Sequence, residues 1–242
     1  MNNKEIHLLL QGLSFDFIEI PPCSFIMGSS PNECWHRNDE LLHSVTLTKK
    51  FWIGKNPVAV EQYNRIAGAA YKGDKKPCKV TWYEAQKFCD ILNERYTDFL
   101  PSGYMFALPT EAQWEYACRA GTETPFNSKD GIEEIAWYSG NAKGAQKVGS
   151  KKKANAWGLY DMHGNVAEWC EDAYAKYDGD RTDPLPRSGN RLNRVIRGGN
   201  WESDASACRS AARDYTRRYL GLFAVNKGIG FRLALVPFRE ER

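Results

Sequence analysis

The stretch RVIRGGNWESDASACRSAARDYTRRYLGLFAVNKGIGFRLAL (residues 194–235) says most about how this chain folds. Residues 194–196 are predicted to form a short strand that runs into Gly198-Gly199, a pair that permits a sharp turn. Over residues 229–236, large apolar residues occupy every second position, and this period of two predicts a half-buried strand. The segment is therefore expected to be held at both ends by strands.

The middle of this segment follows neither a helical nor a strand period. It mixes aromatic and apolar side chains with charged ones, among them Tyr215, Tyr219, Phe223 and Arg217. A loop of this composition between two strands is typical of a recognition surface. The alternative is that the loop simply folds back over the core, and the residues alone leave both open.

Two helices are marked by capping boxes, one formed by Thr81 with Glu84 and the other by Thr110 with Gln113. Each box precedes an apolar stripe of helical period. Further predicted elements are a shorter helix near 58–67, two short strands within 14–29 and one strand over 43–53. Only short strand-like pieces follow residue 121, so the fold class is predicted to be α+β.

The composition of the 242-residue chain describes one globular domain, 1–242. Aromatic residues make up 13% and charged residues 26% of the chain, and no linker divides it. The formal net charge is only +3, and the lysine run at 151–153 is best explained as a solvated turn. No basic face or known motif accompanies that run, so nucleic acid is not expected as a partner.

The sequence also bears on location and redox state. Residues 1–20 lack the apolar region and cleavage site of a signal peptide, and no stretch approaches the roughly 18 apolar residues of a membrane span. We expect a cytoplasmic chain without a membrane partner, and surface display by another protein stays open. The seven cysteines lie singly, without the spacing of a zinc site or a disulfide framework.

Six motifs, in order along nearly the whole chain, resemble the signatures of the formylglycine-generating enzyme (sulfatase-modifying factor) superfamily. The motifs are IPPCSFIMGS, VTLTKKFWIGKNPV, ALPTEAQWEYACRAG, NAWGLYDMHGNVAEWCED, RVIRGGNW and GIGFRLAL. The resemblance implies a C-type-lectin-like fold with two main helices, short strands and much irregular loop. That fold carries both catalysts and binders, so function has to be judged from the site.

The catalytic members of the superfamily convert a sulfatase cysteine to formylglycine, using O2 and a copper(I) ion held by two cysteine thiolates. Thiolates are soft ligands that suit Cu(I). The two matching positions in this chain are Ser203 and Cys208. Because a hydroxyl is a poor Cu(I) ligand, we expect no copper site and no enzyme activity of this kind. Cys208 is expected to pack as a structural thiol, with Cys118 as its neighbour.

The superfamily also includes the variable proteins of diversity-generating retroelements, which display a C-terminal surface encoded by mutagenised Asn codons. The order RGGNW, CRSAAR, GIGFRL resembles their variable regions. Changing the adenines of Asn codons cannot give Lys, Glu, Gln, Met or Trp, and none of these types occurs at 214–226. Glu202 and Lys227 fall outside the reachable set, so they would be framework or another codon type.

We therefore predict a non-catalytic binding protein with a variable, ligand-binding region within 194–235 and a protein or other macromolecule as ligand. Two alternatives remain: a copper-dependent formylglycine-generating oxidase, and a fixed accessory domain of a larger assembly. The predicted ligand-binding residues are Glu202, Ser203, Asp204, Ser206, Ala207, Ala212, Asp214, Tyr215, Thr216, Arg217, Tyr219, Leu222, Phe223, Val225 and Asn226.

The resemblance further implies a structural calcium ion at DMHGNVAEW, residues 161–169. The ligands carried over from the family are the Asp161 side chain, the Gly164 and Val166 carbonyl oxygens, and the Glu168 carboxylate. Calcium takes about six to eight oxygen ligands, and mixed carboxylate and carbonyl sets suit it. The alternative is that both carboxylates bond backbone amides or Arg197. Arg197 and Arg232, in the RGG and GFR motifs, are expected to tie loop carbonyls together.

Overall fold

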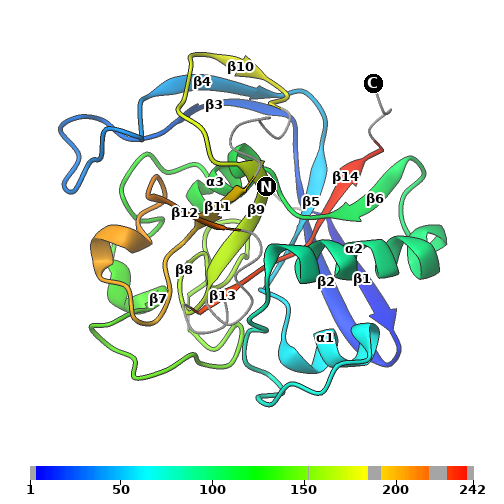
Figure 1. The fold of residues 1–242 in the computed structure, drawn as a ribbon. Helices are drawn as coiled ribbons and strands as arrows, with labels where there is room; N and C mark the ends of the chain where they lie inside the picture. The colour runs from blue at the N-terminus through cyan, green and yellow to red at the C-terminus, as the bar shows by residue number, and fades with distance from the viewer. Residues whose placement is uncertain (1–3, 152, 185–191, 218–227, 239–242) are drawn as a thin grey trace.

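The computed structural model describes residues 4–151, 153–184, 192–217 and 228–238. Within these ranges a few helices and many short strands are joined by long irregular loops (Figure 1), which confirms the α+β class. The predicted helices are present as α1 (Val60–Ala67), α2 (Trp82–Tyr96) and α3 (Glu111–Arg119). No helix in the described part of the chain is long and apolar enough to cross a membrane.

Both capping boxes form as the sequence predicts. The Glu84 N–H donates to the Thr81 hydroxyl oxygen at 3.1 Å, and the Glu84 carboxylate accepts the Thr81 N–H at 2.7 Å. Thr110 and Gln113 make the same pair of bonds at the start of α3, at 3.2 and 2.9 Å. Each box gives partners to N–H groups that a helix start leaves without intrahelical ones.

The larger sheet has the strand order β1–β2–β5–β14–β6, and α2 lies across it in Figure 1. Its strands are β1 (Glu5–Leu10), β2 (Leu13–Ile20), β5 (Phe51–Gly54), β6 (Tyr104–Ala107) and β14 (Ala234–Pro237). The last of these pairs antiparallel with β5 on one side and with β6 on the other. A strand from the end of the chain thus lies inside the sheet.

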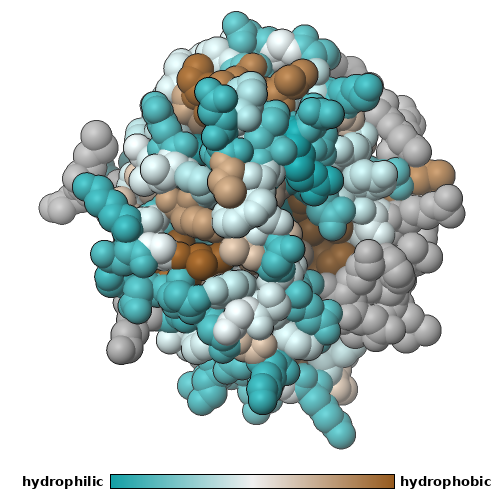
Figure 2. Space-filling model, turned by 90° about the vertical axis from the view of Figure 1, so that its left-hand side faces the viewer, coloured by the Kyte–Doolittle hydropathy of each residue, from teal (hydrophilic) through white to brown (hydrophobic). Residues whose placement is uncertain are grey.

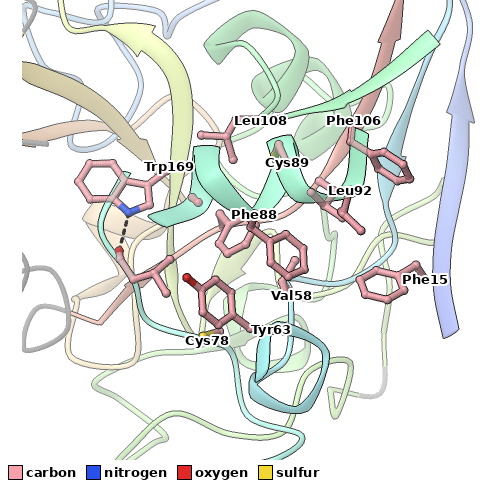
Figure 3. Packing of buried hydrophobic residues seen from close by; sticks show 14 of the residues in the cluster. Phe15, Val58, Tyr63, Cys78, Phe88, Cys89, Leu92, Phe106, Leu108 and Trp169 are labelled. Atoms are coloured by element: carbon pink, nitrogen blue, oxygen red, sulfur yellow. Dashed lines mark hydrogen bonds between the residues drawn. The ribbon is translucent and has the colours of Figure 1, made fainter. Parts of the chain in front are cut away.

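Apolar side chains of α2 fill the space between this sheet and α1 (Figure 3). Phe88 stacks on Tyr63 of α1 at a ring-centroid distance of 5.2 Å, and both rings meet Phe231 edge-on. Trp169 belongs to the same cluster, and its indole N–H donates to the Val80 carbonyl oxygen at 2.8 Å. The cluster therefore joins the larger sheet and two helices to the strand that carries Trp169.

That strand is part of a second sheet, with the order β12–β11–β9–β13. Its members are β9 (Ala167–Ala173), β11 (Asn193–Arg197), β12 (Arg213–Arg217) and β13 (Ile229–Gly230). Smaller elements are β3 (Cys23–Met27), β4 (His43–Leu47), β7 (Ala136–Trp137), β8 (His163–Gly164), β10 (Arg181–Thr182), and the 3-10 helices η1 (Thr97–Phe99), η2 (Ile132–Glu134) and η3 (Ala205–Cys208). A second apolar cluster, with Trp114 of α3 and Val195 of β11 at zero exposure, packs beside this sheet.

Two expectations about strands are wrong. Residues 43–53 form β4 and β5, which lie in different sheets, and not one strand. Residues 229–236 likewise divide between β13 and β14, and every residue from 228 to 236 is buried. The alternation predicted exposure at every second position, but Arg232 turns inward to an ion pair with Glu168.

Candidate binding surface

The C-terminal region begins as the sequence predicts. β11 runs into Gly198 and Gly199, which have φ values of 89° and 65°. A side chain at Gly199 would place its Cβ 2.7 Å from the Cys208 sulfur, so this turn needs glycine for space as well as for backbone conformation. The middle of the region is more regular than expected, because η3 follows and β12 pairs antiparallel with β11 along its whole length.

A cavity of about 280 Å³ lies where β11, β12 and the 198–203 turn meet. Residues predicted to bind ligand contribute much of its lining: Glu202, Ser203, Ala207, Ala212, Asp214, Tyr215 and Thr216. The rest of the lining includes Arg37, Ala167, Ile196, Asn200 and Ile229. The structure therefore brings together residues that the sequence places in one segment and adds others from distant parts of the chain.

The side chains along β12 differ in exposure. Successive side chains of a strand point to opposite sides, so Asp214 and Thr216 share one face while Tyr215 lies on the other. Asp214 and Tyr215 are exposed, whereas Thr216 is buried, as is Ala212 just before the strand. Exposure therefore does not follow the two faces: a ligand can touch Asp214 and Tyr215 on opposite faces, whereas Thr216, on the face of Asp214, is buried.

The remaining predicted residues have different positions. Asp204 caps η3, because its carboxylate accepts the Ala207 N–H at 3.1 Å and the Ser206 hydroxyl at 2.5 Å. Arg217 is the last residue of β12. The predicted contacts at Tyr219, Leu222, Phe223, Val225 and Asn226 lie outside the described residues. The side of the molecule that carries η3 is largely hydrophilic, with apolar side chains gathered at its top (Figure 2).

Ser203 and Cys208, at the positions that match the family's copper ligands, have other surroundings in this structure. The Ser203 hydroxyl accepts the Asn200 N–H at 3.0 Å and donates to the Asn200 side-chain oxygen at 3.2 Å, so it closes a turn. Burial raises the pKa of the Cys208 thiol to about 12, with Asp204 adding to the effect. Burial therefore favours the thiol form of Cys208, and a Cu(I) ion would have to displace this proton. Cys118 and Cys208 are both buried free thiols.

Buried arginines fix the segment between the turn and β12. Arg209 reaches both oxygens of the Glu40 carboxylate at 2.7 and 2.9 Å and donates to the Trp35 carbonyl oxygen at 2.8 Å. Arg213 makes a two-pronged pair with Glu111 at 2.6 and 2.9 Å. Paired guanidinium groups of this kind combine charge with fixed geometry, so residues 208–213 belong to the framework.

Arg197 and Arg232 have the structural roles that the sequence predicts. Arg197 pairs with Glu115 and donates to the carbonyl oxygens of residues 210, 211 and 212. Arg232 pairs with Glu168 and donates to the carbonyl oxygens of residues 54 and 160. Irregular loops lack ladder bonds of their own, so these donors supply partners for their carbonyl oxygens.

The predicted calcium ligands fit the ion only in part. The Glu168 carboxylate accepts the Trp114 indole N–H at 2.7 Å and two Arg232 bonds at 2.6 and 2.8 Å, so its charge already has a partner. Asp161 is different: one oxygen accepts the Gly149 N–H at 2.7 Å, and the other is buried without a hydrogen bond of good geometry from the described residues, although the Asn165 side chain lies near this carboxylate. Burial raises the pKa of Asp161 to about 6. Calcium at Asp161 stays a prediction.

Sequence reasoning missed Arg37 as a wall of the cavity. Its guanidinium donates to the Arg213 carbonyl oxygen at 3.2 Å and lies 3.6 Å from the Asp39 carboxylate. The loop that carries Arg37 is also bonded to the C-terminal region through Arg209. Nothing in the local sequence of this loop signals that contact, because it depends on how residues far apart in the chain are folded together.

Proteins similar in sequence have several different roles. The "Chaperone protein LppX" of Paenibacillus barcinonensis is 28% identical over 67% of this chain and 73% of that protein. A serine/threonine-protein kinase pkn1 of Chlamydia caviae is 34% identical over 64% of this chain, but the match spans only 23% of the kinase. The inactive Cα-formylglycine-generating enzyme 2 of Bos taurus is 26% identical over 84% of this chain and 62% of its own length.

Solved structures agree with the C-type-lectin-like fold. Treponema denticola variable protein 1 superposes with a TM-score of 0.83 at 25% identity, covering 96% of this chain and 99% of that one. PvdO from Pseudomonas aeruginosa gives a TM-score of 0.77 at 25% identity, covering 91% and 94%. The family model described as "Sulfatase-modifying factor enzyme 1-like domain" matches residues 13–236. The chain therefore belongs to the formylglycine-generating, sulfatase-modifying factor family.

Proposed function

We propose that this protein is a non-catalytic binder that presents a retroelement-diversified surface, within residues 202–227, on a C-type-lectin-like scaffold. The observation that carries the proposal is the cavity beside β12. Residues singled out from the sequence as ligand contacts meet there, although the buried framework separates them along the chain. Similarity to Treponema denticola variable protein 1 supports the same function.

The chemistry of the copper positions supports binding over oxidation. Ser203 is engaged in a turn, and Cys208 is a buried thiol whose pKa is raised to about 12. Formylglycine-generating enzymes and inactive relatives both occur among the similar proteins, so family membership alone does not decide between the two functions. Mixed polar and aromatic side chains around a cavity suit recognition of a macromolecule.

Population sequencing tests the diversified form of the proposal. Codons 202–227 would be sequenced from many individuals of the source population, together with the DNA just downstream. Substitutions confined to these codons, and falling at adenines of a nearby template repeat, are expected. An invariant segment would remove diversification and leave a fixed binding or accessory protein.

Surface display tests the binding function itself. A yeast-displayed library randomised at Glu202, Asp204, Asp214 and Tyr215 would be selected on hen lysozyme as a model target. Folded clones that bind the target are expected, because these side chains are exposed and contribute little to the core. A library of equal size at the second cavity, of about 260 Å³, is the matched control and uses Ser14, Asp16, Glu61 and Lys75. Equal recovery from both libraries would count against a dedicated surface beside β12.

We further propose a structural calcium ion at Asp161, supported by its buried oxygen, which has no hydrogen bond of good geometry from the described residues. No group of three His, Cys, Asp or Glu side chains among the described residues is arranged to hold a metal, so backbone carbonyls would have to complete the site. Calcium at 100 times its Kd would add about 2.7 kcal/mol to the free energy of unfolding. Equal melting temperatures in calcium and in EGTA, for wild type and for Asp161→Asn, would disprove the site.

A further inference from the structure

A column of stacked planar groups leads from the interior to Tyr215. The Arg213 guanidinium carbon lies 3.8 Å from the centre of the Tyr177 ring and 4.7 Å from that of Tyr174. The Tyr174 and Tyr215 rings follow with centroids 4.2 Å apart and planes inclined by 30°. Tyr215 is 47% exposed, so the column ends at the surface, next to the cavity.

The inner end of the column cannot shift freely. The Arg213 guanidinium is buried, holds both oxygens of Glu111, and donates to the Asp39 carbonyl oxygen at 2.9 Å. A buried, fully bonded guanidinium keeps one orientation, because any other orientation would leave buried charges without partners. The face that Arg213 offers to Tyr174 is therefore constant.

The Tyr174 ring is fixed at its far edge as well. Its hydroxyl donates to the Asp39 carboxylate at 2.6 Å. Burial and, after it, the neighbouring Asp39 raise the pKa of Tyr174, so the phenol keeps the proton that makes this bond. Asp39 in turn faces Arg37, which lines the cavity. Tyr174 thus belongs to the constant scaffold, outside residues 202–227.

We propose that Tyr174 is a positioning residue of the binding surface: its ring supports a planar side chain at position 215 and holds it as a rigid contact for a protein partner. Rigid aromatic side chains give large contact area at low cost in conformational entropy. A diversified position 215 is therefore biased toward Tyr and Phe, which Asn codons can reach. Position 214, on the other face of β12, has no such support.

The role of Tyr174 in partner contact rests on the proposed function. The packing of residue 215 against the Tyr174 ring does not depend on that function. The first experiment therefore needs no ligand. Codon 215 is randomised in three displayed backgrounds, wild type, Tyr174→Phe and Tyr174→Leu, and each library is sorted for protease resistance. Leu retains apolar bulk at position 174 and removes the aromatic face, so this background is expected to stay folded.

Tyr and Phe at position 215 are expected to be enriched about two- to tenfold in the wild-type and Tyr174→Phe backgrounds, the range that an aromatic pair gives. The enrichment is expected to vanish with Tyr174→Leu, and a library randomised at position 214 serves as control. Equal enrichment in all three backgrounds, or none in wild type, would overturn the proposal.

A second measurement addresses the partner. In a lysozyme binder that retains Tyr215, Tyr174→Leu is expected to raise the dissociation rate about two- to tenfold, with Tyr174→Phe restoring it. An unchanged rate would overturn the positioning role in binding. If the parent library yields no lysozyme binder at all, the proposed function loses its support, and the enrichment at position 215 alone decides whether Tyr174 supports that residue.

Discussion

Two neighbouring parts of the C-terminal region have opposite physical characters. Residues 208–213 are buried, and their arginines are paired with carboxylates from other segments. Glu202 before them, and Asp214 and Tyr215 after them, are exposed beside the cavity. Buried positions, whose side chains bond to other segments, thus lie within a few residues of exposed positions, whose side chains face solvent. The difference shows which positions of this region could be substituted without loss of the buried network.

The largest effect is expected where the framework holds a buried charge. Arg209→Ala leaves the Glu40 carboxylate, which is fully buried, without its charged partner and with the Ser29 hydroxyl as a remaining donor. The free energy of unfolding should fall by about 3–5 kcal/mol. Urea unfolding followed by fluorescence measures it, with Glu202→Ala as the matched exposed change. Similar losses for both variants would erase the distinction between the two parts.

The pH dependence of stability should reveal a second framework residue. Burial lowers the pKa of His163 to about 4, and its Nδ1–H donates to the Cys208 carbonyl oxygen at 2.6 Å. The unfolded chain binds this proton near pH 6.5 and the folded chain does not, so His163 makes stability fall as pH drops from 6.5 to 4. Its contribution over that window is up to about 3 kcal/mol.

Asp161 acts in the opposite direction over nearly the same window, because its pKa is raised to about 6. In wild type, the contributions of His163 and Asp161 to the pH dependence of stability therefore oppose each other. The effect of His163 is measured by comparing a variant with wild type at each pH, in calcium-free buffer. Relative to wild type, His163→Asn should gain stability as pH falls from 6.5 to 4. His7→Asn, at an exposed histidine, is the control. A difference between His163→Asn and wild type that stays constant with pH would refute this assignment.

A smaller loss is expected at the glycine turn that precedes both parts. Gly199→Ala combines a φ of 65° with a Cβ that would lie 2.7 Å from the Cys208 sulfur. We expect a loss of about 1–3 kcal/mol from the backbone strain and the close contact together. Gly12→Ala has a similar φ of 81° but open space around its Cβ, so it isolates the strain. Equal melting temperatures for the two variants would show that crowding at Cys208 is unimportant.

The smallest effect is expected on the exposed face. Glu202→Ala and Asp214→Ala, alone or together, should change the free energy of unfolding by no more than about 0.5 kcal/mol each. Both variants should retain the wild-type urea slope, because neither alters the surface exposed on unfolding. A loss as large as that of Arg209→Ala would mean that these residues belong to the framework after all.

Local chemistry made much of the fold predictable. Capping boxes at Thr81 and Thr110 and the glycine turn after β11 are set by neighbouring residues, and they appear where the sequence places them. Strand boundaries were less predictable. Residues 229–236 look like one alternating strand, but the ion pair of Arg232 with Glu168 buries a charge that alternation assigns to solvent.

The candidate surface was predictable only along its own segment. Composition and the family resemblance pointed to ligand contacts between Glu202 and Asn226, and seven of these predicted residues line the cavity. Arg37 and Tyr174 could not be found this way, because their roles depend on Arg213 and Asp39 meeting in space. Glu168 is a further case: the family resemblance suggested a calcium ligand, which stays a prediction, and the sequence did not indicate its contacts with the Arg232 guanidinium and the Trp114 indole.

The position of β14 in the middle of the larger sheet has a consequence for how this protein would be made. That strand is translated after residues 202–227, and β5 and β6 have no common neighbour until it arrives. A premature stop codon or a frameshift within codons 202–227 would remove it, leaving both strands with open edges. Such a product would be open to proteolysis. Only chains that are translated in frame through β14 can therefore complete the larger sheet and present the surface.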